Sequence, residues 1–172
     1  MKTLQCIFVT GLISFLLIPF ELIAEPYLGA GVSRVEASIT GTAGGEANGF
    51  KIYGGTQVDS LGWEASYQEF GDIAIRPSDS VMSGQSFNFS MLAYLEMNPS
   101  FDWYFRLNMS LWELDIDTFL GPFNDSGSDI SYGFGGQFVI NKQLNFRIEY
   151  EIYDDLNSKD LDILSFNLLY VY

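Results

Sequence analysis

Eight segments of this chain alternate apolar and polar residues one by one, and no other feature restricts its fold as strongly. In the clearest segment, residues 144–152, Arg147, Glu149 and Glu151 each stand between two apolar neighbours. A period of two places successive side chains on opposite faces of a β-strand. The eight segments are residues 27–35, 50–58, 61–68, 87–97, 103–111, 130–140, 144–152 and 164–172. The sequence therefore predicts an all-β fold of eight strands, each about 9–11 residues long.

The connections between these strands alternate between long and short. The long ones are residues 36–48, 72–85, 113–128 and 154–160, and the short ones are residues 59–60, 98–100 and 141–143. An up-and-down barrel in a membrane has this rhythm, because its outer loops are free and its inner turns are tight. A soluble β-sandwich has no reason to keep it. We therefore expect an eight-stranded antiparallel up-and-down barrel.

The two faces of the predicted strands differ sharply. One face consists mainly of Phe, Leu, Ile and Trp, and the other combines glycines with charged residues. The apolar face is too bulky for the narrow interior of an eight-stranded barrel. We therefore expect this face to contact lipid, as in a transmembrane barrel, rather than a hydrophobic ligand inside a soluble barrel. Two aromatic belts are also expected, with Trp63 and Trp103 near the short turns and Tyr67 and Tyr150 near the long connections.

The polar face then fills the interior. Its charged residues are Lys51, Glu64, Glu96, Arg106, Arg147, Glu149 and Glu151. Four tyrosines share this face: Tyr53, Tyr94, Tyr104 and Tyr153. Because a buried charge without a partner is costly, we expect a cross-strand ionic network, with Arg106 at its centre.

Residues 1–24 have the features of a cleavable signal peptide. Lys2 precedes an apolar stretch, residues 7–20, and Ala24 offers a small residue for cleavage. A transmembrane helix anchor is the alternative, although Glu21 ends the stretch early. The sole cysteine, Cys6, precedes the apolar stretch, which disfavours a lipid anchor. We expect a signal peptide over residues 1–24 and one barrel domain over residues 25–172.

Composition argues against several functions. The 172 residues include no histidine, and 8 lysines and arginines stand against 22 aspartates and glutamates, for a formal net charge of -14. An acidic chain lacks the cations that bind nucleic acid, and without histidine the common nucleophile–base pairs cannot form. We therefore expect no enzyme activity, no catalytic residue, no cofactor and no nucleic-acid partner.

Two acidic groups leave alternatives open. Glu149 and Glu151 could act in acid–base chemistry, but we expect them to pair with the interior cations. Four aspartates between residues 113 and 129 could bind Ca²⁺, but their spacing is not that of an EF-hand and a solvated acidic loop is favoured. They are Asp115, Asp117, Asp125 and Asp129. We expect no metal site.

The chain resembles the OmpA-like outer-membrane β-barrel family of Gram-negative bacteria. The resemblance lies in residues 27–31 (Tyr-Leu-Gly-Ala-Gly), 49–55 and 61–71. Residues 165–172 resemble the C-terminal assembly signal of such barrels, with Tyr170 and Tyr172 at its aromatic positions and Asn167 where glycine is common. The resemblance implies an outer-membrane location and contact with lipids, lipopolysaccharide and the barrel-assembly machinery. Because the chain ends with the eighth strand, we expect no peptidoglycan-binding domain.

Two functions remain after this comparison. The favoured one is a structural or surface-interaction barrel with a plugged interior and acidic extracellular loops. The alternative is a narrow pore for small solutes, although eight strands leave little open space between them.

Overall fold

The computed structural model describes residues 25–39, 44–75, 80–118, 121–154 and 159–172. The predicted signal peptide, residues 1–24, lies outside the described residues. Strands account for nearly all of the described part, and within it no helix is long and apolar enough to cross a membrane. The strands are β1 (Glu25–Ile39), β2 (Gly45–Val58), β3 (Leu61–Glu69), β4 (Ile73–Ile75), β5 (Ser80–Asn98), β6 (Phe101–Thr118), β7 (Gly121–Val139), β8 (Leu144–Tyr153) and β9 (Lys159–Val171).

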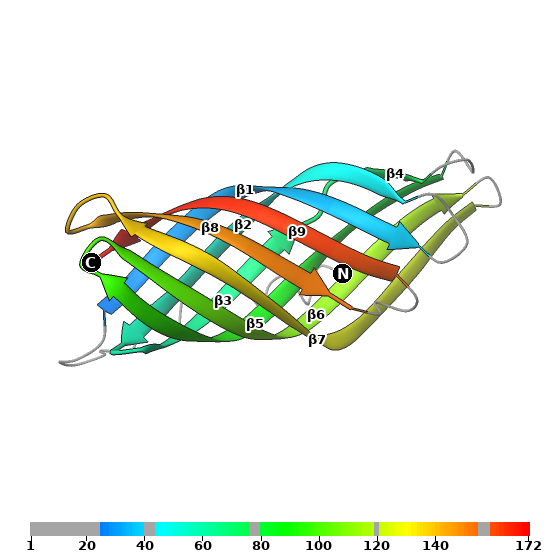
Figure 1. The fold of residues 1–172 in the computed structure, drawn as a ribbon. Coiled ribbons are helices and arrows are strands. Elements are labelled where there is room, and N and C mark those ends of the chain that lie inside the picture. The colour runs from blue at the N-terminus through cyan, green and yellow to red at the C-terminus, as the bar shows by residue number, and fades with distance from the viewer. Residues whose placement is uncertain (1–24, 40–43, 76–79, 119–120, 155–158) are drawn as a thin grey trace.

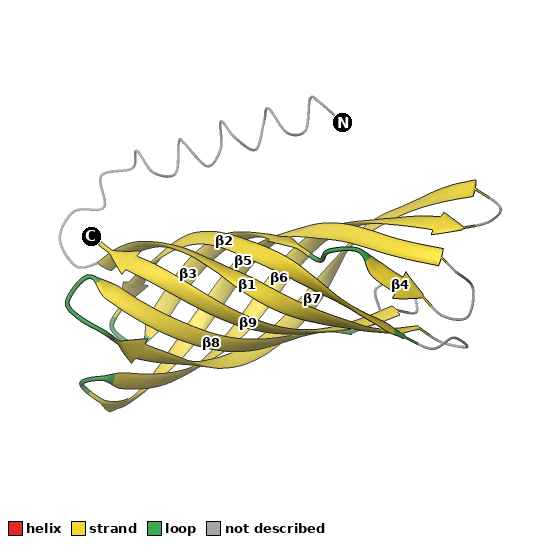
Figure 2. Cartoon of the chain, turned by 90° about the horizontal axis from the view of Figure 1, so that it is seen from above, coloured by secondary structure: helices red, strands yellow, loops and turns green. Residues whose placement is uncertain are grey.

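The strands form one closed antiparallel barrel (Figures 1 and 2). Apart from β3 and β4, which do not pair with each other, each strand pairs with its sequence neighbours. β9 pairs with β1, and β3 pairs with β5 to complete the ring. The short strand β4 pairs with β5 directly beyond the end of β3, so β3 and β4 together act as one barrel strand. The predicted eight-stranded barrel is therefore confirmed, with its third strand interrupted at residues 70–72.

A glycine makes this interruption sterically acceptable. Gly71 has a φ of 75°, in the left-handed region that residues with a Cβ atom rarely adopt. The Phe70 amide still donates a hydrogen bond to the Gly84 carbonyl oxygen, so the chain stays attached to β5 across the break.

Several strands are longer than the sequence indicates. Strands β5, β6 and β7 contain 19, 18 and 19 residues, against the expected 9–11. Most of residues 72–85 and 113–128 were expected to be loops but belong to strands. Strands β6 and β7 stay paired as far as Thr118 and Gly121. The expectation was wrong because the alternation continues there with reversed polarity. Trp112 and Leu114 are buried, whereas Asp115 faces solvent.

This reversal marks the outer edge of the lipid-facing surface. On β6 the outward residues change from Leu111 to Glu113, and on β9 they change from Leu164 to Asp162. Aromatic rings lie at the same level on neighbouring strands, with the Tyr67 ring 5.9 Å from that of Phe50 and 5.0 Å from that of Phe87. Trp and Tyr favour membrane–water interfaces, so these rings form the outer aromatic belt.

A second group of rings lies near the short turns. The Phe101 ring is 5.0 Å from the Trp103 ring, and the Tyr170 ring is 5.2 Å from the Tyr172 ring. Between the two belts the outward side chains are mostly apolar and are exposed or half-buried, while the inward ones are buried. Leu107 is 49% exposed, for example, whereas its neighbour Arg106 is 3% exposed. The predicted assignment of faces is therefore correct for this span.

Cysteine labelling tests the orientation of the barrel in the membrane. Ser126 lies on the outward face of the extended β6–β7 hairpin and Ser60 lies in the short β2–β3 turn, and both are exposed. We expect Ser126→Cys to react with a membrane-impermeant maleimide on intact cells. Ser60→Cys should react only after the outer membrane is disrupted. The opposite pattern would mean that the long strands point into the periplasm.

Candidate functional site

The interior of the barrel holds a compact cluster of six charged side chains. Its members, which we call the ionic cluster, are Lys51, Glu64, Arg106, Arg147, Glu149 and Glu151, and none is more than 3% exposed. They come from β2, β3, β6 and β8, because strict alternation on each strand turns them inward. Three cations face three anions, so the cluster is formally neutral.

Lys51 and Arg106 connect the carboxylates of β8 and β3. The Lys51 Nζ lies 2.5 Å from Glu149 Oε1 and 2.7 Å from Glu151 Oε1. Arg106 donates from Nη1 to Glu149 Oε2 at 2.5 Å and from Nη2 to Glu64 Oε1 at 2.8 Å. Its Nε lies 3.6 Å from Glu151 Oε2, so Arg106 contacts all three carboxylates, as its predicted central position requires.

A glycine opposite Arg106 makes room for its side chain. Gly133 of β7 pairs with Arg106 across the strands. A Cβ atom at this position would lie 2.6 Å from the Tyr150 carbonyl oxygen and 3.2 Å from the Cγ atom of Arg106. A larger residue would therefore displace the arginine or the strand, which explains a glycine in an otherwise regular strand.

Four tyrosines enclose Arg147 on the short-turn side of the cluster. The centre of its guanidinium lies 5.4 Å, 5.3 Å and 4.8 Å from the ring centroids of Tyr27, Tyr53 and Tyr104. Arg147 also donates to the Tyr94 hydroxyl at 3.0 Å and to Glu64 Oε2 at 2.8 Å. These cation–π contacts and charge-assisted hydrogen bonds fix the guanidinium in place.

The set of tyrosines around the ionic cluster differs from the predicted set at two positions. Tyr27, which donates to Glu64 Oε2 at 3.1 Å, belongs to the site although it was not among the predicted interior tyrosines. Its place on the same face as Gly29 and Gly31 was the available signal. Tyr153 faces inward as predicted but lies farther along the barrel, where its ring contacts Phe70 at 5.9 Å.

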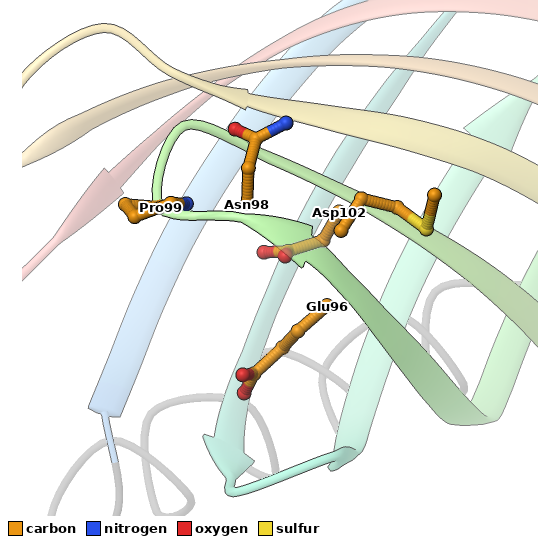
Figure 3. A pocket seen from close by; sticks show the side chains of 5 residues that line it. Glu96, Asn98, Pro99 and Asp102 are labelled. Atoms are coloured by element: carbon orange, nitrogen blue, oxygen red, sulfur yellow. The ribbon is translucent and has the colours of Figure 1, made fainter.

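Glu96 does not belong to the ionic cluster, contrary to expectation. Its side chain is exposed near the β5–β6 turn and lies opposite Asp102. Glu96 keeps the register of Tyr94 and pairs with Asp102, and the register shifts only after it. Its side chain is exposed because it lies one inward position beyond Tyr94, at the open short-turn end of the barrel. Figure 3 shows the two carboxylates beside a pocket of about 360 Å³, which is lined by Glu96, Met97, Asn98, Pro99 and Asp102.

An apolar cluster fills the interior toward the long-connection end. Its buried members are Val35, Ala37, Phe70, Ile73, Ile75, Met82, Trp112, Leu114, Tyr153, Leu161 and Ile163. This cluster was not predicted from the sequence, because much of this region was expected to be loop. The reversed alternation around Trp112 and Leu161 was the signal that could have revealed it.

The candidate acid–base residues and the candidate Ca²⁺-binding aspartates contact other side chains. Glu149 and Glu151, the candidate acid–base pair, share Lys51. Asp115 accepts a hydrogen bond from Asn124 at 2.7 Å, and Asp125 lies 3.3 Å from Lys159 of β9. The four aspartates therefore lie on a strand hairpin rather than in the expected loop. Within the described residues no group of three or more histidine, cysteine, aspartate or glutamate side chains is arranged to hold a metal ion.

A closed antiparallel ring with apolar residues outward and charges inside defines a transmembrane β-barrel. Residues 21–172 match the family model of the outer membrane protein beta-barrel domain, so the chain belongs to that family. Its location is thus the outer membrane of a Gram-negative cell, and the predicted OmpA-like resemblance is confirmed at the level of family and fold. No curated protein sequence compared with the chain matches it.

Solved outer-membrane barrels have the same fold. Ail, the attachment invasion locus protein of Yersinia pestis, is 13% identical, with a TM-score of 0.66 over 88% of this chain and 100% of Ail. Neisserial surface protein A is 14% identical, with a TM-score of 0.68 over 86% of this chain and 97% of that chain. The N-terminal β-barrel domain of Pseudomonas aeruginosa OprF is 7% identical, with a TM-score of 0.60 over 84% and 97%. At these identities the likeness concerns the fold alone.

Proposed function

We propose that this protein is a closed outer-membrane barrel with a structural and surface-contact role. The ionic cluster is the observation that carries this proposal. Its charges pair across the interior from β2, β3, β6 and β8, so a solute or ion moving through the barrel would have to separate buried pairs. Separating such pairs in a low-dielectric interior is costly. A narrow pore, the alternative, requires an arrangement in which these pairs open.

The apolar cluster supports the same proposal. It lies beyond the ionic cluster along the barrel, so the two clusters would obstruct the interior in series. An ion that passed the charged residues would still have to leave water among side chains such as Phe70, Met82 and Leu114. The absence of histidine from the sequence and the engagement of Glu149 and Glu151 with Lys51 support a role without catalysis.

The outer surface of the proposed extracellular end is strongly acidic. Beyond the outer aromatic belt, its outward carboxylates are Glu36, Glu46, Glu69, Asp72, Glu113, Asp115, Asp117, Asp154, Asp160 and Asp162. The described cations of this end are Arg34, which pairs with Glu36 and Glu46, and Lys159, which pairs with Asp125. Ail has been crystallised with the heparin analogue sucrose octasulfate, a polyanion. An acidic surface repels polyanions, so we infer that this chain favours cationic partners instead.

The acidic outer surface can contact lipopolysaccharide if divalent cations lie between the two. Carboxylate oxygens are good ligands for Ca²⁺, which can bridge them to the phosphate groups of lipopolysaccharide. The exposed Tyr170 and Tyr172, at the C-terminal end, support recognition by the barrel-assembly machinery during biogenesis. Neither contact requires the barrel interior to open.

Binding of a fluorescent decalysine peptide tests the surface role. The measurement uses zwitterionic nanodiscs at low salt. The triple variant Glu113→Gln, Asp115→Asn and Asp117→Asn should bind this peptide several-fold more weakly than wild type, because it removes three negative charges from the outward face of β6. The matched control carries Asp59→Asn, Glu96→Gln and Asp102→Asn at the short-turn end. An equal loss of affinity in both triple variants would show that overall charge, rather than the extended outer surface, attracts the peptide.

A further inference from the structure

We propose that the outer half of β7 binds an extended, cationic peptide segment as an added β-strand. The binding edge, as we call it, consists of Asn124, Ser126, Ser128 and Ile130, whose backbone groups point away from β6. The cationic character of the partner rests on the proposed function, because it follows from the acidic outer surface. The binding edge itself follows from the pairing of the strands.

One side of the outer half of β7 has no described strand paired with it. Strand β7 spans Gly121–Val139, but its pairing with β8 extends only as far as Tyr132, opposite Ile152. On its other side, β7 stays paired with β6 as far as Gly121. The arrow of β8 accordingly ends short of the outer end of β7 in Figure 1. Within the described part of the chain, the outer half of β7 is therefore an edge strand.

Hydrogen bonds near the short turn show which backbone groups of β7 point away from β6. The Ile140 amide donates to the Leu144 carbonyl oxygen of β8, whereas the Val139 amide donates to the Ser100 carbonyl oxygen, next to β6. In an antiparallel sheet, the backbone groups of successive residues point alternately toward the two neighbouring strands. The register of β7 with β6 is continuous from Phe138 to Gly121. Even-numbered residues therefore point away from β6 along the whole strand.

The outer half of β7 keeps this alternation. The Ile130 amide donates to Oδ1 of Asp129 at 2.7 Å rather than to β6. The amides of Ser126 and Ser128 point in the same direction, and no described strand pairs with them on that side. Because Pro122 has no amide hydrogen, the row of donors ends before it. The binding edge thus offers the alternating donors and acceptors that an extended chain requires.

The binding edge is accessible from water. All four of its residues are exposed, and Gly127 between the two serines has no side chain. Ser126 pairs with Glu113, which lies just beyond the lipid-facing surface of β6. An exposed edge of this kind is a template for another strand, and addition of a strand is a common mode of peptide binding.

Carboxylates on the outward face beside the binding edge favour a cationic partner. Glu113 and Asp115 accept hydrogen bonds from the Asn124 side chain, which is neutral and leaves both charges uncompensated. An added strand would lie about 10 Å from β6, two strand spacings away. A lysine on that strand opposite Ser126 could therefore reach Glu113 across the small serine side chain.

A further carboxylate would be released when a strand is added. The Asp129 carboxylate accepts from the Ile130 amide, which belongs to the binding edge. A carbonyl oxygen of an incoming strand would replace this acceptor. Asp129 would then be free to pair with a lysine or arginine of the partner, and opposite charges on neighbouring strands stabilise a sheet.

Amide hydrogen exchange of the protein in zwitterionic nanodiscs at low salt tests this proposal. The probe is a decapeptide of alternating lysine and threonine. We expect it to slow exchange at the Ser126 and Ser128 amides several-fold. The Gly127 amide points toward β6 and is the internal control, which should exchange slowly with and without the peptide. The matched probe is the same peptide with all backbone amides methylated, because it keeps the charge but cannot pair as a strand.

A pair of variants removes one backbone donor from the protein. Ser126→Pro lacks the amide hydrogen at the centre of the binding edge and should bind the decapeptide several-fold more weakly than wild type. Proline is tolerated at an edge position whose amide is not used by the sheet, so the pairing with β6 should persist. Ser126→Ala keeps the amide and should bind as wild type does. Both variants have the net charge of the wild-type protein.

The outcomes separate this inference from the proposed function. Equal binding of the methylated and unmodified peptides, without slower exchange at the binding edge, would overturn strand addition and leave the acidic surface intact. A neutral decapeptide of serine and threonine that binds as tightly would overturn the cationic partner. Slow exchange at Ser126 and Ser128 without any peptide would also contradict the proposal, and its dependence on protein concentration would indicate a second copy of this chain as the occupant.

Discussion

Arg106→Ala is expected to lower the free energy of unfolding by about 3–5 kcal/mol, because it removes one partner from a buried ionic cluster. Glu64 and Glu149 would each lose a short charge-assisted hydrogen bond, and Arg147 and Lys51 would be left to balance three carboxylates. Urea unfolding of the protein in lipid vesicles, followed by tryptophan fluorescence, measures the change.

Arg34→Ala is the matched control for this effect. Arg34 also pairs with two carboxylates, Glu36 and Glu46, but all three side chains are more than half exposed. Exposed ion pairs contribute little, so this variant should change stability by less than about 1 kcal/mol. Equal effects of Arg34→Ala and Arg106→Ala would mean that the interior cluster is hydrated like the surface pair.

Leu107→Arg is expected to cause the second large loss of stability, and it tests the lipid-facing surface. Leu107 lies on β6 midway between the two aromatic belts, with its side chain directed outward. A charged residue on the lipid face near the bilayer midplane costs about 2–4 kcal/mol. The variant should therefore fold into vesicles with a correspondingly lower stability, measured by the same unfolding experiment.

Ser126→Arg provides the comparison for Leu107→Arg. Ser126 is outward and exposed, as Leu107 is, but it lies on the extended part of β7 beyond the outer belt. Arginine at this position stays in water, and the stability should hardly change. A similar cost at the two positions would contradict the location of the membrane boundary between Leu111 and Glu113.

The period-two alternation predicted the span between the two aromatic belts, where one pattern of outward and inward residues holds. Between the two belts most outward residues are apolar and most inward ones are polar, so the inward direction of Lys51, Arg106 and Glu149 followed from alternation alone. The buried Leu92 of β5 is an apolar exception among the inward residues. Pairing between these residues also followed, because charges confined to a narrow interior must find partners. Which pairs form could not be predicted, because this depends on the register and tilt that bring β2 opposite β8 across the barrel.

The predictions from alternation were wrong at the two ends of the barrel, beyond the aromatic belts. Past Leu111 the same strand turns Glu113 outward and buries Trp112, so the pattern of apolar outward residues ends at the membrane edge and predicted a loop there. At the other end, Glu96 keeps the regular pairing but lies beyond Tyr94 at the mouth of the barrel, where its side chain is exposed. Alternation describes which side of a strand a residue occupies, but it does not reveal where the medium outside the strand changes or where the barrel interior opens to water.

Single-channel recording in planar lipid bilayers tests the closed interior most directly. The wild-type protein should insert without steady conductance, because the ionic cluster and the apolar cluster obstruct the interior in series. Insertion is verified separately by the protease resistance of the folded barrel in the same vesicles used for fusion. A stable, water-filled conductance in the wild-type protein would contradict the closed barrel and favour a pore for small solutes.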